Sequence, residues 1–208
     1  MSIKKNDFIL LEYTAKIKGT SKIFDTTKSD IAKANSLPTN INYEPLVICV
    51  GNRDVVPGLD DSLPGKDIGN FKIIVPAKDA FGEKNPNLVK IVNINVFNKQ
   101  KINPLPGLQV NVDNSIGTIR SVAGGRVIVD FNHPLAGRDI EYDVEIIKLI
   151  ENDEEKLIGL AKLYFNAKAE LVDNIAKIDY NMPESLKKEF TEKIKKLIPS
   201  IKDVEFKK

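Results

Sequence analysis

Residues 51–82 restrict the fold of this chain more than any other stretch, because glycine, proline and apolar residues recur there at fixed spacings. Pro57 suits the first turn of a helix, where its missing N–H costs nothing, and the acidic residues 60–61 follow where the helix dipole favours negative charge. Four apolar residues are spaced to share one face: Val55, Val56, Leu59 and Leu63. Residues 71–75 are rich in β-branched and aromatic side chains, which predicts a strand. We therefore expect a short helix against a sheet, followed by a turn that carries Phe81.

Nine positions of the same stretch follow the spacing Gly-x3-Val-x2-Gly-x4-Leu, then a glycine, a strand and Pro-x3-Ala-aromatic-Gly. They are Gly51, Val55, Gly58, Leu63, Gly69, Pro76, Ala80, Phe81 and Gly82. This pattern resembles the FKBP-type peptidyl-prolyl isomerases. The resemblance implies an α+β fold in which an antiparallel FKBP half-barrel wraps around one short helix. It also implies an enzyme that accelerates rotation about X–Pro bonds.

The N-terminal residues continue the resemblance. Residues 7–17 and 22–27 have strand composition and predict a hairpin. In the family, an aromatic late in the first strand and a Phe-Asp pair in the second line the pocket, and Tyr13, Phe24 and Asp25 fall at those positions. Alone, these residues are read more simply as two core aromatics and a turn aspartate. The central motif favours the pocket.

The remaining pocket positions lie on two further predicted strands. Residues 28–43 are polar and predict a loop, with one helical turn possible at 29–34. Residues 46–50 and 138–150 predict strands. The pocket implied by the resemblance consists of Tyr13, Phe24, Asp25, Leu46, Val55, Val56, Leu59, Phe81 and Tyr142.

The resemblance also assigns roles within the pocket. Asp25 is expected to be the polar group nearest the twisting carbonyl, and the N–H of Val56 is expected to hold a substrate carbonyl. Two positions depart from the family pattern. Phe81 replaces a tyrosine and lacks its hydroxyl donor, and Leu59 replaces a tryptophan, as in SlyD-type members. These changes put macrolide binding in doubt and predict weaker catalysis on short peptides.

Residues 85–130 exceed a minimal FKBP domain and predict a small all-β domain inserted between 1–84 and 131–150. Three strands are expected at 109–112, 116–122 and 126–130, with hairpin turns at Asp113-Asn114 and Gly124-Gly125. The placement resembles the insert-in-flap domain of SlyD-type FKBPs, which binds unfolded polypeptide as a chaperone. An exposed apolar surface for such clients is expected at Leu88, Ile91, Val92, Val96 and Phe97.

The segment 132–137 resembles the sequence that closes the insert in SlyD-like proteins, and it contains the one histidine of the chain, His133. A turn histidine satisfied by backbone hydrogen bonds is favoured over a catalytic one. Some SlyD-type proteins carry a histidine- and cysteine-rich tail that delivers nickel. This chain lacks such residues at its end, so neither a metal site nor a cofactor is expected.

Residues 151–208 lie beyond the resemblance to the isomerase domain and predict a C-terminal α/β domain. Helices are expected at 152–165 and 183–198, the second capped by Asn181. Residues 170–179 predict a strand or a hairpin around Asp173-Asn174, and residues 204–206 a last short strand. Long archaeal FKBPs carry an extra C-terminal domain of similar size. Because about sixty residues form a marginal core alone, we expect this segment to dock on a partner, most simply a second copy in a homodimer.

Composition excludes several other classes of protein. The formal net charge of the 208 residues is +2, which gives no basis for nucleic-acid or membrane binding. No apolar run reaches the length of a membrane span and no secretory signal is visible, so a cytoplasmic protein is expected. The single cysteine, Cys49, excludes an intramolecular disulfide and sits among apolar residues.

Two hypotheses of function remain open. In the first, the protein is a prolyl isomerase whose insert binds unfolded or partly folded proline-containing polypeptides. In the second, the isomerase pocket is weak or vestigial, and the insert and C-terminal segment act as a holdase. Phe81 is the residue that keeps the second hypothesis open.

Overall fold

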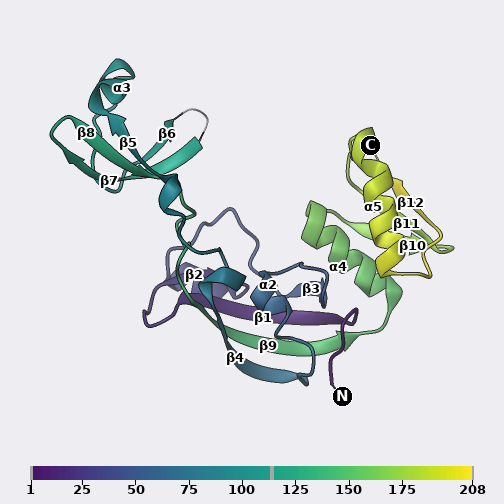
Figure 1. The fold of residues 1–208 in the computed structure, drawn as a ribbon. Helices are drawn as coiled ribbons and strands as arrows, with labels where there is room; N and C mark the ends of the chain where they lie inside the picture. Colours follow the sequence, from purple (N-terminus) through teal and green to yellow (C-terminus); the bar gives the residue numbers. More distant parts are fainter. Residues whose placement is uncertain (1, 113–114, 208) are drawn as a thin grey trace. The chain divides into compact units, whose positions relative to one another are not determined.

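The computed structural model describes residues 2–112 and 115–207, and the chain divides into two compact units (Figure 1). The first unit comprises Met1–Ala80 and Asp139–Lys208, and the second comprises Phe81–Arg138. Because one unit interrupts the sequence of the other, the first unit is assembled from segments that lie far apart along the chain.

An antiparallel sheet of five strands forms the frame of the first unit. The strands are β1 (Phe8–Ile17), β2 (Ile23–Thr26), β3 (Leu46–Cys49), β4 (Gly69–Val75) and β9 (Ile140–Ile150). Four of them lie in the order β2-β1-β9-β4, and β3 pairs with the N-terminal half of β1. All five strands were predicted from sequence and are confirmed. The last of them in sequence, β9, occupies the middle of the sheet, between β1 and β4.

A short helix, α2 (Pro57–Asp60), packs against this sheet and lies over it in Figure 1. Pro57 occupies the first helical position, as predicted. Leu59 and Leu63 are buried, together with Val75 of β4. The short segments α1 (Ser29–Ala34) and η1 (Ala77–Asp79) complete this part. The predicted short helix against a sheet is confirmed.

The second unit is built on an antiparallel four-stranded sheet of order β5-β8-β7-β6. Its elements are η2 (Pro86–Leu88), β5 (Val89–Asn93), α3 (Ile94–Lys99), β6 (Gln109–Val112), β7 (Ser115–Ala123) and β8 (Arg126–Asp130). The three predicted strands are confirmed. Gly124 and Gly125 both have positive φ angles of 55° and 75°, which suit the tight turn between β7 and β8. The turn predicted at Asp113-Asn114 lies outside the described residues.

The expectation of an all-β insert is wrong, because helix α3 follows β5 directly. Asn93 caps this helix: its side chain accepts a hydrogen bond of 2.9 Å from the N–H of Asn95. Ile94 and Phe97 are three residues apart and lie on the same face of the helix. Phe97 packs in the small core of the unit, where it is 1% exposed. Phe97 was expected on an exposed apolar surface, and that expectation is also wrong.

The C-terminal segment has the predicted succession of helices and strands. Its elements are α4 (Asp153–Phe165), β10 (Ala169–Val172), β11 (Ile175–Ile178), α5 (Glu184–Leu197) and β12 (Asp203–Phe206). Asn152 caps α4, its side chain accepting from the N–H of Glu155. The predicted cap of α5 is wrong. Pro183 occupies the cap position and no side chain caps this helix, because Asn181 lies two residues too early in the chain.

The core of the C-terminal segment continues into the large sheet. Buried Leu157, Leu160 and Ile194 of the two helices join one cluster with Phe8 and Cys49 of the sheet. Helix α4 approaches β3 closely at Gly159. The sheet of the same chain therefore completes much of this marginal core. Within the part of the chain that the structure describes, no helix has the length and apolar character needed to cross a membrane.

Candidate functional site

One row of residues crosses four strands and forms the base of the candidate site. Ala15 of β1 lies opposite Asp25 of β2 on one side and Tyr142 of β9 on the other. Tyr142 in turn lies opposite Ile73 of β4. Residues that lie opposite one another in antiparallel strands point to the same face of the sheet. Ala15, between Asp25 and Tyr142, is buried on this face.

Tyr13 completes the group, because it precedes Ala15 by two residues and shares its face. Its hydroxyl donates a hydrogen bond of 2.8 Å to Oδ2 of Asp25. Its ring meets that of Tyr142 edge to face, with centroids 5.7 Å apart and planes at 72°. We call Tyr13, Asp25 and Tyr142 the Tyr–Asp cluster. The structure thus brings together three of the pocket residues predicted from sequence.

The electrostatics of the Tyr–Asp cluster follow from its burial. Burial raises the pKa of the Asp25 carboxyl above its ordinary value, and the hydrogen bond from Tyr13 partly offsets this rise. Burial also raises the pKa of both tyrosines, and the nearby charge of Asp25 raises it further. Both phenols therefore remain protonated at neutral pH. Tyr13 keeps its donor role, and Asp25 offers a polar edge in an otherwise aromatic setting.

Phe24 reaches its position through an irregularity in the sheet. Ala15 lies opposite Asp25, but the next residue, Lys16, lies opposite Ile23, so β2 has one extra residue at Phe24. Such a bulge bends the strand and redirects a side chain that strict alternation would send to the other face. The side chains of the adjacent residues Phe24 and Asp25 are therefore not required to point to opposite faces of the sheet. Phe24 is half-buried.

Leu46 also lies on the face of the Tyr–Asp cluster. It begins β3 and lies opposite Leu11, which precedes Tyr13 by two residues. Val55 and Val56 are half-buried in the loop before α2, and Leu59 within α2 is buried. The C=O of Val56 accepts from the first free N–H groups of the helix. Among the described residues, by contrast, no hydrogen bond uses the N–H of Val56.

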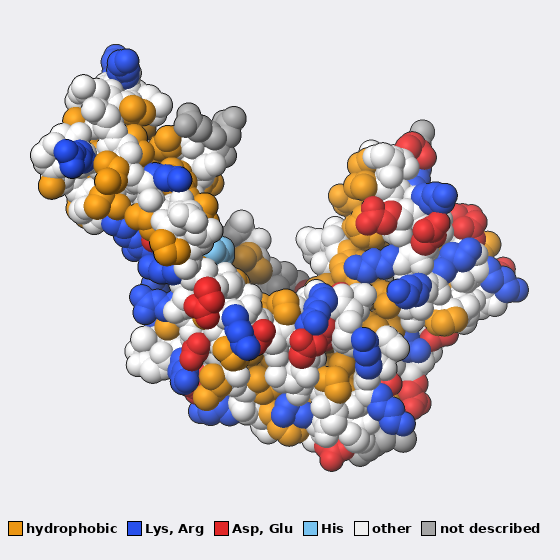
Figure 2. All heavy atoms as spheres, viewed as in Figure 1, with side chains coloured by type: hydrophobic (Ala, Val, Ile, Leu, Met, Phe, Trp, Pro, Cys, Tyr) orange, Lys and Arg blue, Asp and Glu red, His pale blue; other side chains and the backbone are white. Residues whose placement is uncertain are grey.

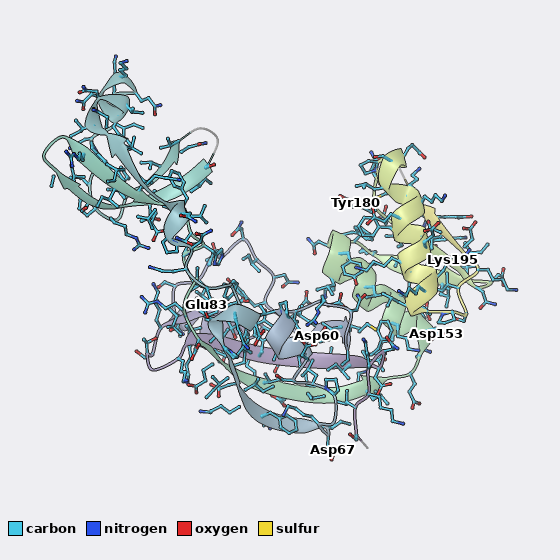
Figure 3. The ribbon with its side chains drawn as sticks, viewed as in Figure 1. Asp60, Asp67, Glu83, Asp153, Tyr180 and Lys195 are labelled. Carbon is cyan, nitrogen blue, oxygen red and sulfur yellow. The ribbon has the colours of Figure 1, made fainter. Side chains whose placement is uncertain are left out.

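A buried carboxylate shapes the loop that carries Val55 and Val56. Asp60, labelled in Figure 3, is 0% exposed and accepts bonds of 2.8 Å from the N–H groups of Gly51 and Arg53. Arg53 has a φ of 63°, a conformation that a non-glycine residue adopts only with such support. From the sequence, Asp60 was expected only to place a negative charge near the start of a helix. The sequence spacing between Gly51 and Asp60 does not indicate that the Asp60 carboxylate binds the backbone of this loop.

Gly58 of α2 is required by close packing, which yields a testable prediction. A Cβ atom at this position would lie 2.4 Å from Cγ1 of Val75 and 2.9 Å from Cβ of Asp79. Gly58→Ala should therefore push α2 away from β4 and destabilise the protein by about 1 to 2 kcal/mol. Urea unfolding would measure this change. A stabilised variant, as helix propensity alone predicts, would show that the approach is looser than described.

Phe81 belongs to the second unit, whereas the Tyr–Asp cluster belongs to the first. It is half-buried, and its ring stacks on His133 with centroids 4.8 Å apart and planes at 7°. Nδ1 of His133 accepts a hydrogen bond of 3.2 Å from the N–H of Leu135. The prediction of a turn histidine with a backbone partner is confirmed. The stacking on Phe81 had no sequence signal, because the two residues lie far apart in the chain.

The residues predicted to bind clients differ in their exposure. Leu88, Ile91 and Val96 are 40%, 67% and 37% exposed, whereas Val92 is half-buried. Phe97, as noted above, belongs to the core. Further apolar side chains are exposed on the same unit and were missed: Val89, Leu105, Leu108 and Ile116. Figure 2 shows apolar side chains on the visible face of this unit. Several apolar side chains of this unit are thus exposed.

The antiparallel sheet with a short helix packed against it is consistent with the fold of the FKBP class. Comparison with known proteins agrees. The family model described as FKBP-type peptidyl-prolyl cis-trans isomerase matches residues 1–98, and that described as FKBP26, IF domain, matches residues 90–135.

Named relatives match along much of the chain. The SlyD peptidyl-prolyl cis-trans isomerase of Pasteurella multocida is 31% identical over 163 residues, which are 76% of this chain and 74% of the relative. The short-type isomerase of Methanocaldococcus jannaschii is 26% identical over 147 residues, 69% of this chain and 92% of the relative. The SlyD protein of Escherichia coli is 33% identical over 119 residues, 54% of this chain and 60% of the relative. The chain belongs to the FKBP-type peptidyl-prolyl cis-trans isomerases and is an enzyme of that class.

Proposed function

We propose that the Tyr–Asp cluster binds X–Pro segments of folding polypeptides and accelerates their cis–trans isomerisation. The observation that carries this proposal is the bond of 2.8 Å between Tyr13 and Asp25, beside Tyr142 on the same face. It sets one polar edge within an aromatic surface that can receive a proline ring. The walls that we propose within the first unit are Phe24, Leu46, Val55, Val56 and Leu59.

The reaction requires selective binding rather than bond cleavage. Rotation about a peptide bond has a barrier of about 18 to 20 kcal/mol, because the planar amide is stabilised by resonance. The twisted amide has less charge on its oxygen and a more basic nitrogen. An apolar setting with few hydrogen-bond donors therefore favours the twisted form over the planar one. Each ~1.4 kcal/mol of such selectivity accelerates the reaction about tenfold.

Two polar groups would orient the substrate in this proposal. The N–H of Val56 is available to donate to a substrate carbonyl, because it donates to no acceptor within residues 2–112 and 115–207. Asp25 would lie nearest the twisting carbonyl, and its hydrogen bond to Tyr13 would fix the direction of its carboxylate. Phe81 lacks a hydroxyl, so it cannot supply the hydrogen-bond donor that a tyrosine would have.

The inserted unit would act as a chaperone that holds unfolded chains. Its exposed apolar residues, such as Ile91, and its edge strand β5 support this role, because both can bind an extended apolar segment. Tethering such a segment near the isomerase site would raise its local concentration there. The setting we propose is the cytoplasm. The alternative is a holdase with a vestigial isomerase site, which would suppress aggregation without accelerating isomerisation.

Asp25→Ala tests the proposed site. This variant is expected to lower kcat/KM on a proline-containing tetrapeptide about tenfold, because it removes the polar edge of the site and leaves the hydroxyl of Tyr13 without its acceptor. Asp143→Ala is the matched control. Asp143 follows Tyr142 on β9, points to the opposite face, and forms an ion pair with Lys16 that is partly exposed.

The comparison of the two aspartate variants decides between the hypotheses. Loss of activity in Asp25→Ala with normal activity in Asp143→Ala supports the site. Equal activity in both variants and the intact chain would reject the assignment of Asp25. An intact chain without activity on peptide or protein substrates, but with suppressed aggregation, would favour the holdase.

A homodimer through the C-terminal segment is a separate proposal. Its most exposed large apolar side chains are Ile158, Val172, Tyr180 and Leu186, between 38% and 43% exposed. Such a dimer would have to cover them, since the main core of the segment is already covered within the chain. Analytical ultracentrifugation of the intact chain and of Leu186→Lys would test it.

A further inference from the structure

Tyr164, near the end of α4, reaches the loop that precedes α2. Its hydroxyl donates a bond of 2.7 Å to Oδ1 of Asp54. The side-chain amide of Asn52 donates to the same two groups, at 2.8 Å to the Tyr164 hydroxyl and 2.7 Å to Oδ1 of Asp54. A closed triangle of hydrogen bonds thus links the C-terminal segment to residues 52 and 54.

Asp54 also forms a hydrogen bond with the backbone of β3. Its second oxygen, Oδ2, accepts a bond of 2.9 Å from the N–H of Cys49 at the end of β3. Asp60 holds the other side of the same loop through the N–H groups of Gly51 and Arg53. Asp60 therefore holds the loop from α2, and Asp54 holds it in an orientation set by its bond to Tyr164. Val55 and Val56 follow Asp54 directly in the chain.

The Tyr164 side chain is itself held firmly by its surroundings. Nζ of Lys193 on α5 lies 4.2 Å from the centroid of its ring. The rings of Phe165 and Phe190 lie 6.1 and 6.5 Å away, centroid to centroid. Helix α4 is fixed on β3, because Gly159 lets the two approach closely. The hydroxyl thus reaches Asp54 from a rigid element rather than from a mobile one.

We propose that Tyr164 is a positioning residue of the isomerase, and that the C-terminal segment acts through Asp54 to fix the Val55–Val56 backbone that orients the substrate. This inference rests on the proposed role of Val56 in the site. It gives residues 151–208 a function in catalysis that is separate from client binding. This hydrogen bond between the Tyr164 hydroxyl and the Asp54 carboxylate takes no part in the reaction itself. It restricts the loop to one conformation.

Tyr164→Phe is the decisive variant, because it removes the hydroxyl and keeps the ring with its packing. The loop then loses one of the bonds that orient Asp54, and small displacements of a substrate-orienting group are costly to the rate. We expect kcat on a tetrapeptide to fall about tenfold, with KM within about twofold of the intact chain. The amide NMR signals of Val55 and Val56 should shift as well.

Two further variants make the test specific. Asp54→Asn should lower kcat by a similar factor, and the double variant Tyr164→Phe/Asp54→Asn should lower it no further, because both changes break the same connection. Tyr180→Phe is the matched control. Tyr180, labelled in Figure 3, lies in the same segment and stacks on Phe165 at 5.0 Å, and no described hydrogen bond uses its hydroxyl. It should leave kcat unchanged.

Asp25→Ala, assayed beside these variants, separates the two proposals. If Asp25→Ala loses activity while Tyr164→Phe keeps the kcat and amide signals of the intact chain, the positioning role is overturned and the site stands. If both variants keep full activity, the site is misassigned and the positioning role falls with it. Should Tyr164→Phe fail to fold, Asp54→Asn decides in the same way, with urea unfolding as the check on its stability.

Discussion

Replacing residues 85–130 with a short flexible loop is expected to slow the catalysed refolding of a proline-limited protein about 100-fold. The same change should leave kcat/KM on a tetrapeptide within about twofold of the intact chain. A protein substrate gains from being held near the site, because tethering turns the second binding event into an intramolecular one. A tetrapeptide is too short to contact both places, so it gains nothing from the insert.

The structure shows where such a deletion can be made. The N–H of Asn85 donates to the side chain of Asn132 at 2.8 Å, and that side chain donates back to the C=O of Asn85 at 3.0 Å. The two ends of the insert therefore lie side by side, and a short loop can join them. The inserted unit also has a core of its own, centred on Phe97 and Val129.

A pair of point variants refines this test without any deletion. Ile91→Ser removes an apolar side chain that is 67% exposed on β5, and it should slow catalysed refolding while sparing the tetrapeptide rate. Ile74→Ser makes the same chemical change at a side chain 51% exposed on β4 of the first unit, and it should change neither rate. Equal refolding rates in the intact chain, the deletion and both point variants would exclude a client-binding role for the insert.

Gly159→Ala is expected to destabilise the protein by about 3 kcal/mol, although alanine normally stabilises the interior of a helix by about 1 kcal/mol relative to glycine. The reason is contact with β3. A Cβ at position 159 would lie 2.3 Å from Cβ of Val47 and 2.5 and 2.7 Å from its two methyl carbons. Helix α4 would have to move away from β3, opening the core that the C-terminal segment shares with the sheet.

A double-mutant cycle would identify the contact responsible. In a Val47→Ala background two of the three closest atoms are gone, so Gly159→Ala should cost less there than in the intact chain. Urea unfolding of the four proteins supplies the free energies. An equal cost in both backgrounds would show that Val47 is not the obstacle. A stabilising effect of Gly159→Ala would mean that α4 does not pack on β3 as described.

The local patterns of the sequence were sufficient for most of the elements. The β-branched and aromatic composition of residues 71–75, the proline that starts α2 and the hairpin turn at Gly124-Gly125 each depend on neighbours within a few positions. Each element was predicted correctly. The nine-position motif also led to Tyr13, Asp25 and Tyr142, which the sheet register places on one face. Helix α3 had a usable signal in Asn93 and the Ile94–Phe97 spacing, but the β-branched residues around it favoured a strand.

The tertiary structure alone decided the relations between distant residues. No local pattern relates Tyr164 to Asp54, or Gly159 to Val47, because these contacts join segments that are more than a hundred residues apart. The bulge at Phe24 depends on the register of two paired strands, and Asp60 is buried only because the loop folds back over it. The sequence by itself determined the family, the strands and the aromatic and acidic residues of the site. The packing of the C-terminal segment on β3, and with it the support of the Val55–Val56 loop, was determined only when those strands and helices came together.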